Sequence, residues 1–194
     1  DAPRNIGVVG LGAGTLATYG KSGDHWKFYE INPDVIDYAQ RHFTFLSQCA
    51  AEVEVLPGDA RLTLAREPEN QFDILILDAF SGDAIPVHLL TTEALAIYRR
   101  CLKPDGALVI HITNQYFDLA PIAAGLAEDA GYSVTVIDNR ETLKPFANRS
   151  MWAVLSANPE AIAAVSKISD KEIVPVRRQL KWTDDRSNLF EALR

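Results

Sequence analysis

Cysteine is scarce in this sequence: its 194 residues include only two, Cys49 and Cys101, and neither belongs to a paired motif. Isolated cysteines of this kind predict packed thiols in a reducing compartment rather than a disulfide or a metal site. No apolar run reaches the roughly 18 residues that span a membrane, and no signal-peptide pattern is present. We therefore expect a cytoplasmic chain without direct membrane insertion. The missing initiator Met also fits excision from a larger parent protein.

Positive charge is also in short supply, with 19 Lys and Arg against 26 Asp and Glu, for a net charge of -7. Repulsion from phosphates argues against nucleic acid as a partner. No His, Cys and carboxylate cluster suggests a metal, and no Ser, His and Asp arrangement has nucleophile-elbow spacing. The remaining composition, 47% hydrophobic and 23% charged, is ordinary for a globular protein, and the length predicts one domain over residues 1–194.

The sequence does contain an alternation of short apolar runs and amphipathic segments. The runs predict buried parallel strands and the segments between them predict helices. The expected strands are Ile6–Gly10, Trp26–Ile31, Val53–Leu56, Phe72–Leu77 and Ala107–Ile112. The expected helices are Thr15–Tyr19, Asp34–His42, Ala60–Ala65, Thr92–Cys101 and Asp118–Ala130. Lys103–Gly106 predicts a turn, and Gly131 predicts the end of the last of these helices.

Two further expected strands, Ser133–Ile137 and Ser150–Leu155, are joined by a segment without a helical pattern. They predict an antiparallel pair at one sheet edge. Five β-α repeats followed by this pair predict an α/β, doubly wound, mostly parallel seven-stranded sheet with helices on both faces. Ligands of such sheets bind outside the carboxyl ends of the strands. The residues that follow each strand are therefore the functional candidates.

The first two strand ends carry a glycine-rich turn and a carboxylate. The turn is Gly10-Leu-Gly12-Ala-Gly14, in which glycines permit tight turning and close approach of a ligand. Glu30 ends the second strand, 20 residues after Gly10, where a carboxylate can accept hydrogen bonds from both ribose hydroxyls. Alone, Glu30 is better explained as a solvated or capping residue. Together with the glycine turn it favours nucleotide or nucleoside binding.

The third strand is followed by Gly58-Asp59-Ala60. The Asp59 carboxylate can accept from the exocyclic amine of adenine, while the N–H of Ala60 can donate to a ring nitrogen. Alone, Asp59 is better explained as the N-cap of the next helix.

The fourth strand runs into Asp78-Ala-Phe-Ser-Gly-Asp83-Ala-Ile-Pro86. Two carboxylates, Asp78 and Asp83, are thereby expected where the reactive end of a ligand lies. A loop rich in Asp, Ser and Gly is often only a loop, but a carboxylate directly after a buried strand has its position fixed by the sheet.

In these motifs the chain resembles the class I S-adenosylmethionine-dependent methyltransferase fold and, within it, the spermidine synthase (polyamine aminopropyltransferase) family. The resemblance runs from about Ile6 to Leu189, nearly the whole chain, and is greatest to the spermidine synthase-like domains that bacteria attach to membrane transporter segments. Its motifs are Val9–Ala17, Phe28–Pro33, Gly58–Arg61, Leu77–Pro86 and Trp182–Asn188.

The resemblance implies an enzyme that moves an aminopropyl group from decarboxylated S-adenosylmethionine to putrescine or a related amine, with no metal. It implies that Glu30 holds the ribose, that Asp59 holds the adenine, that Asp78 is the catalytic aspartate and that Asp83 faces the amine. The implied nucleoside contacts are Gly10, Gly12, Gly14, Glu30, Ile31, Asp59 and Ala60. The implied partner is a small amine, and a homodimer is compatible with the family.

Two departures from the family pattern keep alternatives open. Ala13 stands where spermidine synthases carry an Asp that pairs with the amine of the decarboxylated donor, and the small N-terminal β-domain of those enzymes is absent. The alternatives are a methyltransferase that uses S-adenosylmethionine itself, and a non-catalytic domain that binds a nucleoside or polyamine.

The chemistry requires a neutral amine, whereas a free alkylamine is mostly protonated near neutral pH. Asp78 can accept the proton as a general base. Asp184 or Asp185 is expected either to bind the distal ammonium or to lie in a solvated tail. His111 ends the fifth expected strand and is expected either to approach the site or, as the simpler explanation, to be structural, and His88 is expected to be packed or exposed.

Overall fold

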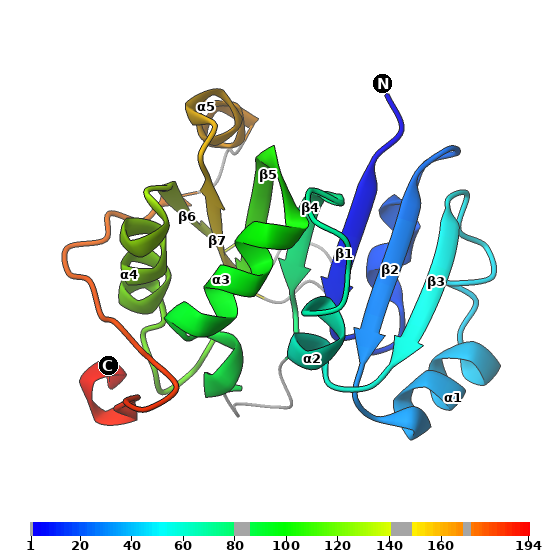
Figure 1. Cartoon of the computed structure of the whole chain (residues 1–194), viewed down its shortest axis with the longest axis horizontal. Helices are drawn as coiled ribbons and strands as arrows, with labels where there is room; N and C mark the ends of the chain where they lie inside the picture. The colour runs from blue at the N-terminus through cyan, green and yellow to red at the C-terminus, as the bar shows by residue number, and fades with distance from the viewer. Residues whose placement is uncertain (1, 80–85, 141–148, 169–171) are drawn as a thin grey trace.

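One twisted sheet organises the chain, with strand order β3-β2-β1-β4-β5-β7-β6-β8 (Figure 1). The computed structural model describes residues 2–79, 86–140, 149–168 and 172–194. The strands are β1 Asn5–Val9, β2 His25–Glu30, β3 Glu52–Pro57, β4 Phe72–Leu77, β5 Leu102–His111, β6 Ser133–Asn139, β7 Ser150–Ser156 and β8 Glu172–Ile173.

The first five strands are mutually parallel, and β7 is antiparallel to both of its neighbours. The predicted doubly wound, mostly parallel sheet and the antiparallel pairing of the last two long strands are confirmed. β7 is inserted between β5 and β6, so this pair reads β5-β7-β6 across the sheet. The two-residue β8 adds an eighth strand outside β6, and a strand this short has no periodicity that a sequence pattern can reveal.

Helices connect the strands. The α-helices are α1 Pro33–His42, α2 Ala60–Leu64, α3 Thr92–Cys101, α4 Ala120–Ala130 and α5 Pro159–Ile168. The short 3-10 helices are η1 Thr15–Tyr19, η2 Val87–Leu89 and η3 Leu189–Ala192. In the parts of the chain that the structure describes, no helix has both the length and the hydropathy that crossing a membrane requires.

Local signals explain several helix boundaries. Asn32 caps α1 by accepting from the N–H of Asp34, and Thr91 caps α3 by accepting from the N–H of Ala94. α4 ends at Gly131, which has a left-handed φ of 67°, as the sequence predicts. The expected helix Thr15–Tyr19 forms as a 3-10 turn, which suits a segment that is only five residues long.

Two apolar clusters cover the two faces of the sheet. Side chains alternate along each strand, so Val9 and Tyr29 face the larger cluster, which includes residues of α2, α3 and α4. Val8 and Phe28 face the smaller cluster, which includes residues of η1 and α1. Figure 1 shows α2, α3 and α4 in front of the sheet. This burial on both faces fixes the position of every strand end.

The predicted turn Lys103–Gly106 lies inside β5 rather than before it. The β4–β5 register jumps from the pair Phe72 and Leu102 to the pair Ile74 and Ala107, so the turn residues bulge out opposite a single residue, Asp73. Lys103 Nζ is 2.8 Å from both carboxylate oxygens of Asp73 and ties the bulge to β4. The turn was therefore predicted at the right residues, but it interrupts β5, whose residues pair with β4 both before and after it.

The C-terminal segment passes α4 and ends below that helix, at the lower left of the view (Figure 1). The N–H of Leu180 donates to the carbonyl of Pro121, and a Cβ on Gly125 would lie 2.1 Å from the Leu180 carbonyl oxygen. Trp182 is fully buried, and its carbonyl accepts from the N–H of Thr92. This segment is thus part of the core.

Candidate functional site

The carboxyl ends of β1, β2 and β4, together with the start of α2 and with η2, enclose a cavity of about 400 Å³. This volume is within the usual range for small-molecule sites. Seven of the nine predicted site residues line it: Gly10, Gly12, Glu30, Ile31, Asp59, Ala60 and Asp78. Of the other two, Gly14 lies outside the lining, and Asp83 falls outside the described residues.

The glycine turn forms one wall of the cavity. Gly10 has a φ of 94°, and a Cβ there would lie 2.4 Å from the carbonyl oxygen of Asp78. Gly12 has a φ of 53°, and a Cβ there would meet nothing within 4 Å. Gly10 is therefore required by the approach of the β4 end, whereas Gly12 leaves open space on the cavity side of the turn.

Gly14 has a structural reason of its own. It precedes η1 with a φ of 82°, and a Cβ there would lie 3.0 Å from the side chain of Leu46. Its glycine is thus explained by the entry into η1 and by packing on Leu46. The residue does not contribute to the cavity wall.

Glu30 ties the glycine turn to the end of β2. Its Oε2 accepts from the N–H of Leu11 at 3.0 Å, and its Oε1 accepts from the N–H of Asn32 at 2.9 Å. Each carboxylate oxygen can accept a second hydrogen bond. Glu30 therefore organises the wall while retaining acceptor capacity toward the cavity that it lines.

Asp59 is the N-cap of α2, as the simpler interpretation of the sequence predicted. Its Oδ1 accepts from the N–H of Leu62 at 2.9 Å. Its Oδ2 lies 3.7 Å from Nε2 of His88, and both residues line the cavity. The cap uses one oxygen and leaves the other at the cavity.

Asp78 follows β4 directly and is one-third exposed. Its Oδ1 lies 2.8 Å from Nδ1 of His111, the last residue of β5. Nε2 of His111 lies 2.6 Å from Oγ1 of Thr113, and the ring of Trp152 stacks on the imidazole with centroids 4.5 Å apart. Of the two expectations for His111, the approach to the site is the one that this contact supports, although the sequence did not indicate Asp78 as its partner.

The strand register could have revealed it. Leu77 pairs with Ile110 across β4 and β5, so the next residues along, Asp78 and His111, must lie side by side. A sequence without a known register cannot align the ends of two strands.

η2 contributes a second group of residues that the sequence analysis did not assign to the site. Pro86, His88 and Leu89 line the cavity opposite the glycine turn. His88 is half exposed and contacts Asp59. No regular pattern marks a loop histidine as a neighbour of a given strand end.

The terminal acidic pair does not line the cavity. Asp184 accepts from Nη1 of Arg61 at 2.7 Å and from the Thr91 hydroxyl at 2.8 Å. The Arg61 and Thr91 hydrogen bonds lower the pKa of Asp184 to about 2. Neither Asp184 nor Asp185 is among the lining residues, so the structure gives Asp184 an architectural role.

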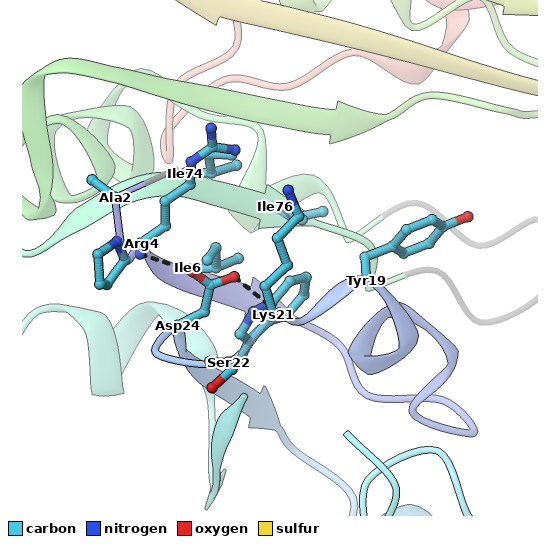
Figure 2. Close-up of a pocket in the computed structure, with 11 residues that line it drawn as sticks. Ala2, Arg4, Ile6, Tyr19, Lys21, Ser22, Asp24, Ile74 and Ile76 are labelled. Atoms are coloured by element: carbon cyan, nitrogen blue, oxygen red, sulfur yellow. Dashed lines mark hydrogen bonds between the residues drawn. The ribbon is translucent and has the colours of Figure 1, made fainter. Parts of the chain in front are cut away.

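A second cavity, of about 300 Å³, lies on the face of the smaller cluster, toward the amino halves of β1 and β4. Figure 2 shows Asp24 between Arg4 and Lys21, with Ile6, Ile74 and Ile76 beside them. The Asp24 carboxylate accepts from the N–H of Arg4 at 2.9 Å and from the N–H of Lys21 at 3.1 Å. Its carboxylate is therefore used to fasten the N-terminal segment to the turn before β2.

Neither cysteine forms a disulfide. Cys49 donates to the carbonyl of Ala17, and Cys101 is buried in the larger cluster, which confirms the prediction of packed thiols. Within the described ranges, no group of three or more His, Cys, Asp or Glu side chains could hold a metal ion.

The fold and the cavity together define a class. A parallel sheet with β7 inserted antiparallel beside β5, a glycine turn after β1 and carboxylates after β2 and β4 is the arrangement of class I methyltransferase-like domains. Solved structures agree. Human methyltransferase-like protein 13 superposes with a TM-score of 0.57 at 18% identity, over 94% of this chain and 86% of that one.

Within that class the chain is similar to polyamine aminopropyltransferases, which confirms the resemblance seen in the motifs. The Vibrio vulnificus polyamine aminopropyltransferase is 34% identical over 125 residues, 60% of this chain and 40% of that protein. A probable spermidine synthase from Corynebacterium glutamicum superposes with a TM-score of 0.62 at 20% identity, over 88% of this chain and 64% of that one.

The similarity is not confined to one activity. An N-terminal histidine N-methyltransferase from Emericella nidulans is 34% identical over 116 residues, 57% of this chain and 20% of that protein. The chain thus spans well under half the length of these two curated relatives. No protein-family model matches it.

Proposed function

We propose that the chain transfers an aminopropyl group from decarboxylated S-adenosylmethionine to putrescine or a related small amine. The observation that carries this proposal is the position of Asp78. It lines the same cavity as Glu30 and Asp59, at the end of the next strand from the glycine turn. The similarity to polyamine aminopropyltransferases supports the choice of reaction.

The lining residues fit an adenosyl ligand. The open space at Gly12 admits a ligand close to the backbone, and the remaining acceptor capacity of Glu30 suits ribose hydroxyls. Ile31 is largely exposed beside Glu30 and offers an apolar surface for the adenine ring. Asp59 Oδ2 and the Ala60 N–H then read the adenine edge.

Asp78 would handle the proton. The amine nitrogen attacks the carbon next to the sulfonium, the carbon–sulfur bond breaks and its electron pair stays on sulfur. Methylthioadenosine leaves, and Asp78 accepts the proton that the amine loses. General-base catalysis of this kind contributes about 10²–10⁴-fold. Asp83, as a second carboxylate toward the amine, belongs to the same proposal.

The test is a mass-spectrometric assay with putrescine and each donor, decarboxylated and carboxylated, in parallel. We expect methylthioadenosine and spermidine from the decarboxylated donor, with Asp78→Asn reducing the rate about 10²–10⁴-fold. Asp105→Asn is the matched control, because Asp105 is an exposed residue of the β5 bulge. Donor binding without turnover would contradict the proposal and favour a non-catalytic binding domain.

A methyltransferase is the second candidate. Ala13 lacks the carboxylate that would pair with the donor amine, and one curated relative is an N-methyltransferase. In the same assay, S-adenosylhomocysteine formed from the carboxylated donor would establish this candidate instead.

We further propose that residues 1–194 act as one catalytic domain in the cytoplasm. Light scattering on the purified chain distinguishes a homodimer from a monomer.

A further inference from the structure

Three neighbouring strands meet at the imidazole of His111. Asp78 extends β4, His111 ends β5, and Trp152 on β7 is the direct register partner of His111. The ring of Trp152 lies within 19° of parallel to the imidazole plane. The stacking and the two ring-nitrogen contacts together fix the orientation of the imidazole beside Asp78.

The contacts at Asp78 and Thr113 together determine the tautomer of a neutral His111. The N–H of Met151 donates to Oγ1 of Thr113 at 2.7 Å, so the single hydroxyl hydrogen must point elsewhere. Nε2 of His111 lies 2.6 Å from Oγ1, whereas the Met151 carbonyl oxygen lies 3.5 Å away. The carboxylate oxygen of Asp78 is the acceptor at Nδ1, so Nε2 of a neutral imidazole is left to accept from the hydroxyl. A neutral imidazole then carries its hydrogen on Nδ1 and donates to Oδ1 of Asp78.

We propose that His111 is a positioning residue for Asp78, held in its tautomer by Thr113. It binds Oδ1, keeps the carboxylate in one orientation and leaves Oδ2 to receive the amine proton. This inference rests on the proposed function, since it assigns the means by which the same site aims its base. His111 does not line the cavity, and its proposed role involves no contact with the donor.

The orientation has a chemical purpose. A proton acceptor works only within hydrogen-bond reach of the proton it takes, and a misplacement of about 1 Å can cost about 10²-fold in rate. Without His111, the carboxylate of Asp78 could rotate about its side-chain bonds. The rate should therefore fall while the donor, held by Glu30 and Asp59, binds as before.

The test compares two substitutions at His111. His111→Asn keeps an N–H donor near the position of Nδ1, whereas His111→Leu removes it. We expect His111→Leu to lower kcat about 10²-fold, with donor Kd and KM unchanged, and His111→Asn to restore most of the rate. Thr113→Ser, which keeps the hydroxyl, should have a higher kcat than Thr113→Val. Equal rates for the wild type and His111→Leu would overturn the inference, as would donor binding that falls in step with kcat.

A nitrogen-15 NMR spectrum of the imidazoles distinguishes a failure of the proposed function from a failure of the role assigned to His111. We expect the Nδ1–H tautomer for His111, assigned by its loss in His111→Asn among the four histidines of the chain. That tautomer in a wild type without aminopropyl transfer would refute the proposed function, and with it the role in turnover. An Nε2–H tautomer in an active wild type would refute the positioning by His111 alone.

Discussion

At the scale of single residues, two carboxylates combine a structural hydrogen bond with a place in the cavity lining. Glu30 fastens two backbone segments, and Asp59 caps α2, yet both also line the cavity. From the sequence, capping and ligand binding were competing explanations for these residues. They are compatible because a carboxylate has two oxygens, each with room for more than one hydrogen bond. A residue type alone therefore cannot decide between the two roles.

The two cavity glycines should respond differently to alanine. Gly10→Ala places a methyl group against the Asp78 carbonyl, so we expect a loss of about 1–3 kcal/mol in unfolding free energy. Gly12→Ala has room and pays only the left-handed backbone cost, about 1–2 kcal/mol. Its methyl group enters the open space, so the loss of donor-binding free energy should be larger than the loss of unfolding free energy.

Urea unfolding and calorimetric titration with the decarboxylated donor measure the two quantities. Equal stability and equal affinity for the two variants would show that the turn adjusts to either methyl group.

At the scale of elements, strongly patterned segments were predicted closely. Phe72–Leu77 and Thr92–Cys101 form β4 and α3 at the predicted bounds, because apolar periodicity and the Thr91 cap define them locally. The bulge in β5 and the strand β8 were missed, since they depend on pairing with a distant strand. Elements formed by local interactions were thus predictable from the sequence, whereas features formed by long-range strand pairing were not.

Gly125 illustrates a long-range requirement within a helix. Alanine in a helix interior normally stabilises by about 1 kcal/mol relative to glycine. In α4, however, the new Cβ would lie 2.1 Å from the Leu180 carbonyl oxygen. We expect Gly125→Ala to destabilise the protein by about 1–3 kcal/mol through overpacking. It should also speed proteolysis of the segment that contains Leu180. A rise in the thermal midpoint would show that this segment does not press on α4.

At the scale of the whole molecule, topology predicted the place of the site and register decided its details. The rule that ligands bind at carboxyl strand ends brought together seven of the nine candidates. His88 was not found by this rule because it lies in η2 rather than at a strand end, and the contact of His111 with Asp78 depends on the β4–β5 register. Asp184 was a candidate as an acid of the terminal motif, either for the distal ammonium or in a solvated tail, and its pairing with Arg61 required the path of the C-terminal segment.

The Asp184 pair also predicts a dependence of stability on pH. Its pKa in the folded protein is about 2, below the ordinary 3.8, so its ionised form stabilises the fold above pH 3.8. That contribution should disappear as the pH falls from about 4 to about 2. Asp184→Asn should lose less stability than the wild type over this window.

Asp185→Asn is the matched control, because it removes the same formal charge from a residue without a hydrogen bond or ion pair to any described part of the chain. Denaturant midpoints at several pH values provide the measurement. If the denaturant midpoints of Asp184→Asn and the wild type changed equally steeply with pH, the assigned pairing would be contradicted.

The Arg61–Asp184 contact joins residues 123 positions apart and adjoins one wall of the cavity. During synthesis at about 5–20 residues per second, α2 leaves the ribosome many seconds before its partner. The nascent chain can assemble β1 to β4 early, but the Arg61 guanidinium, which also donates to the His88 carbonyl, gains its carboxylate only once residue 184 has been synthesised. The wall of the cavity at α2 is thus expected to become fully supported only after the segment that contains Asp184 has been synthesised.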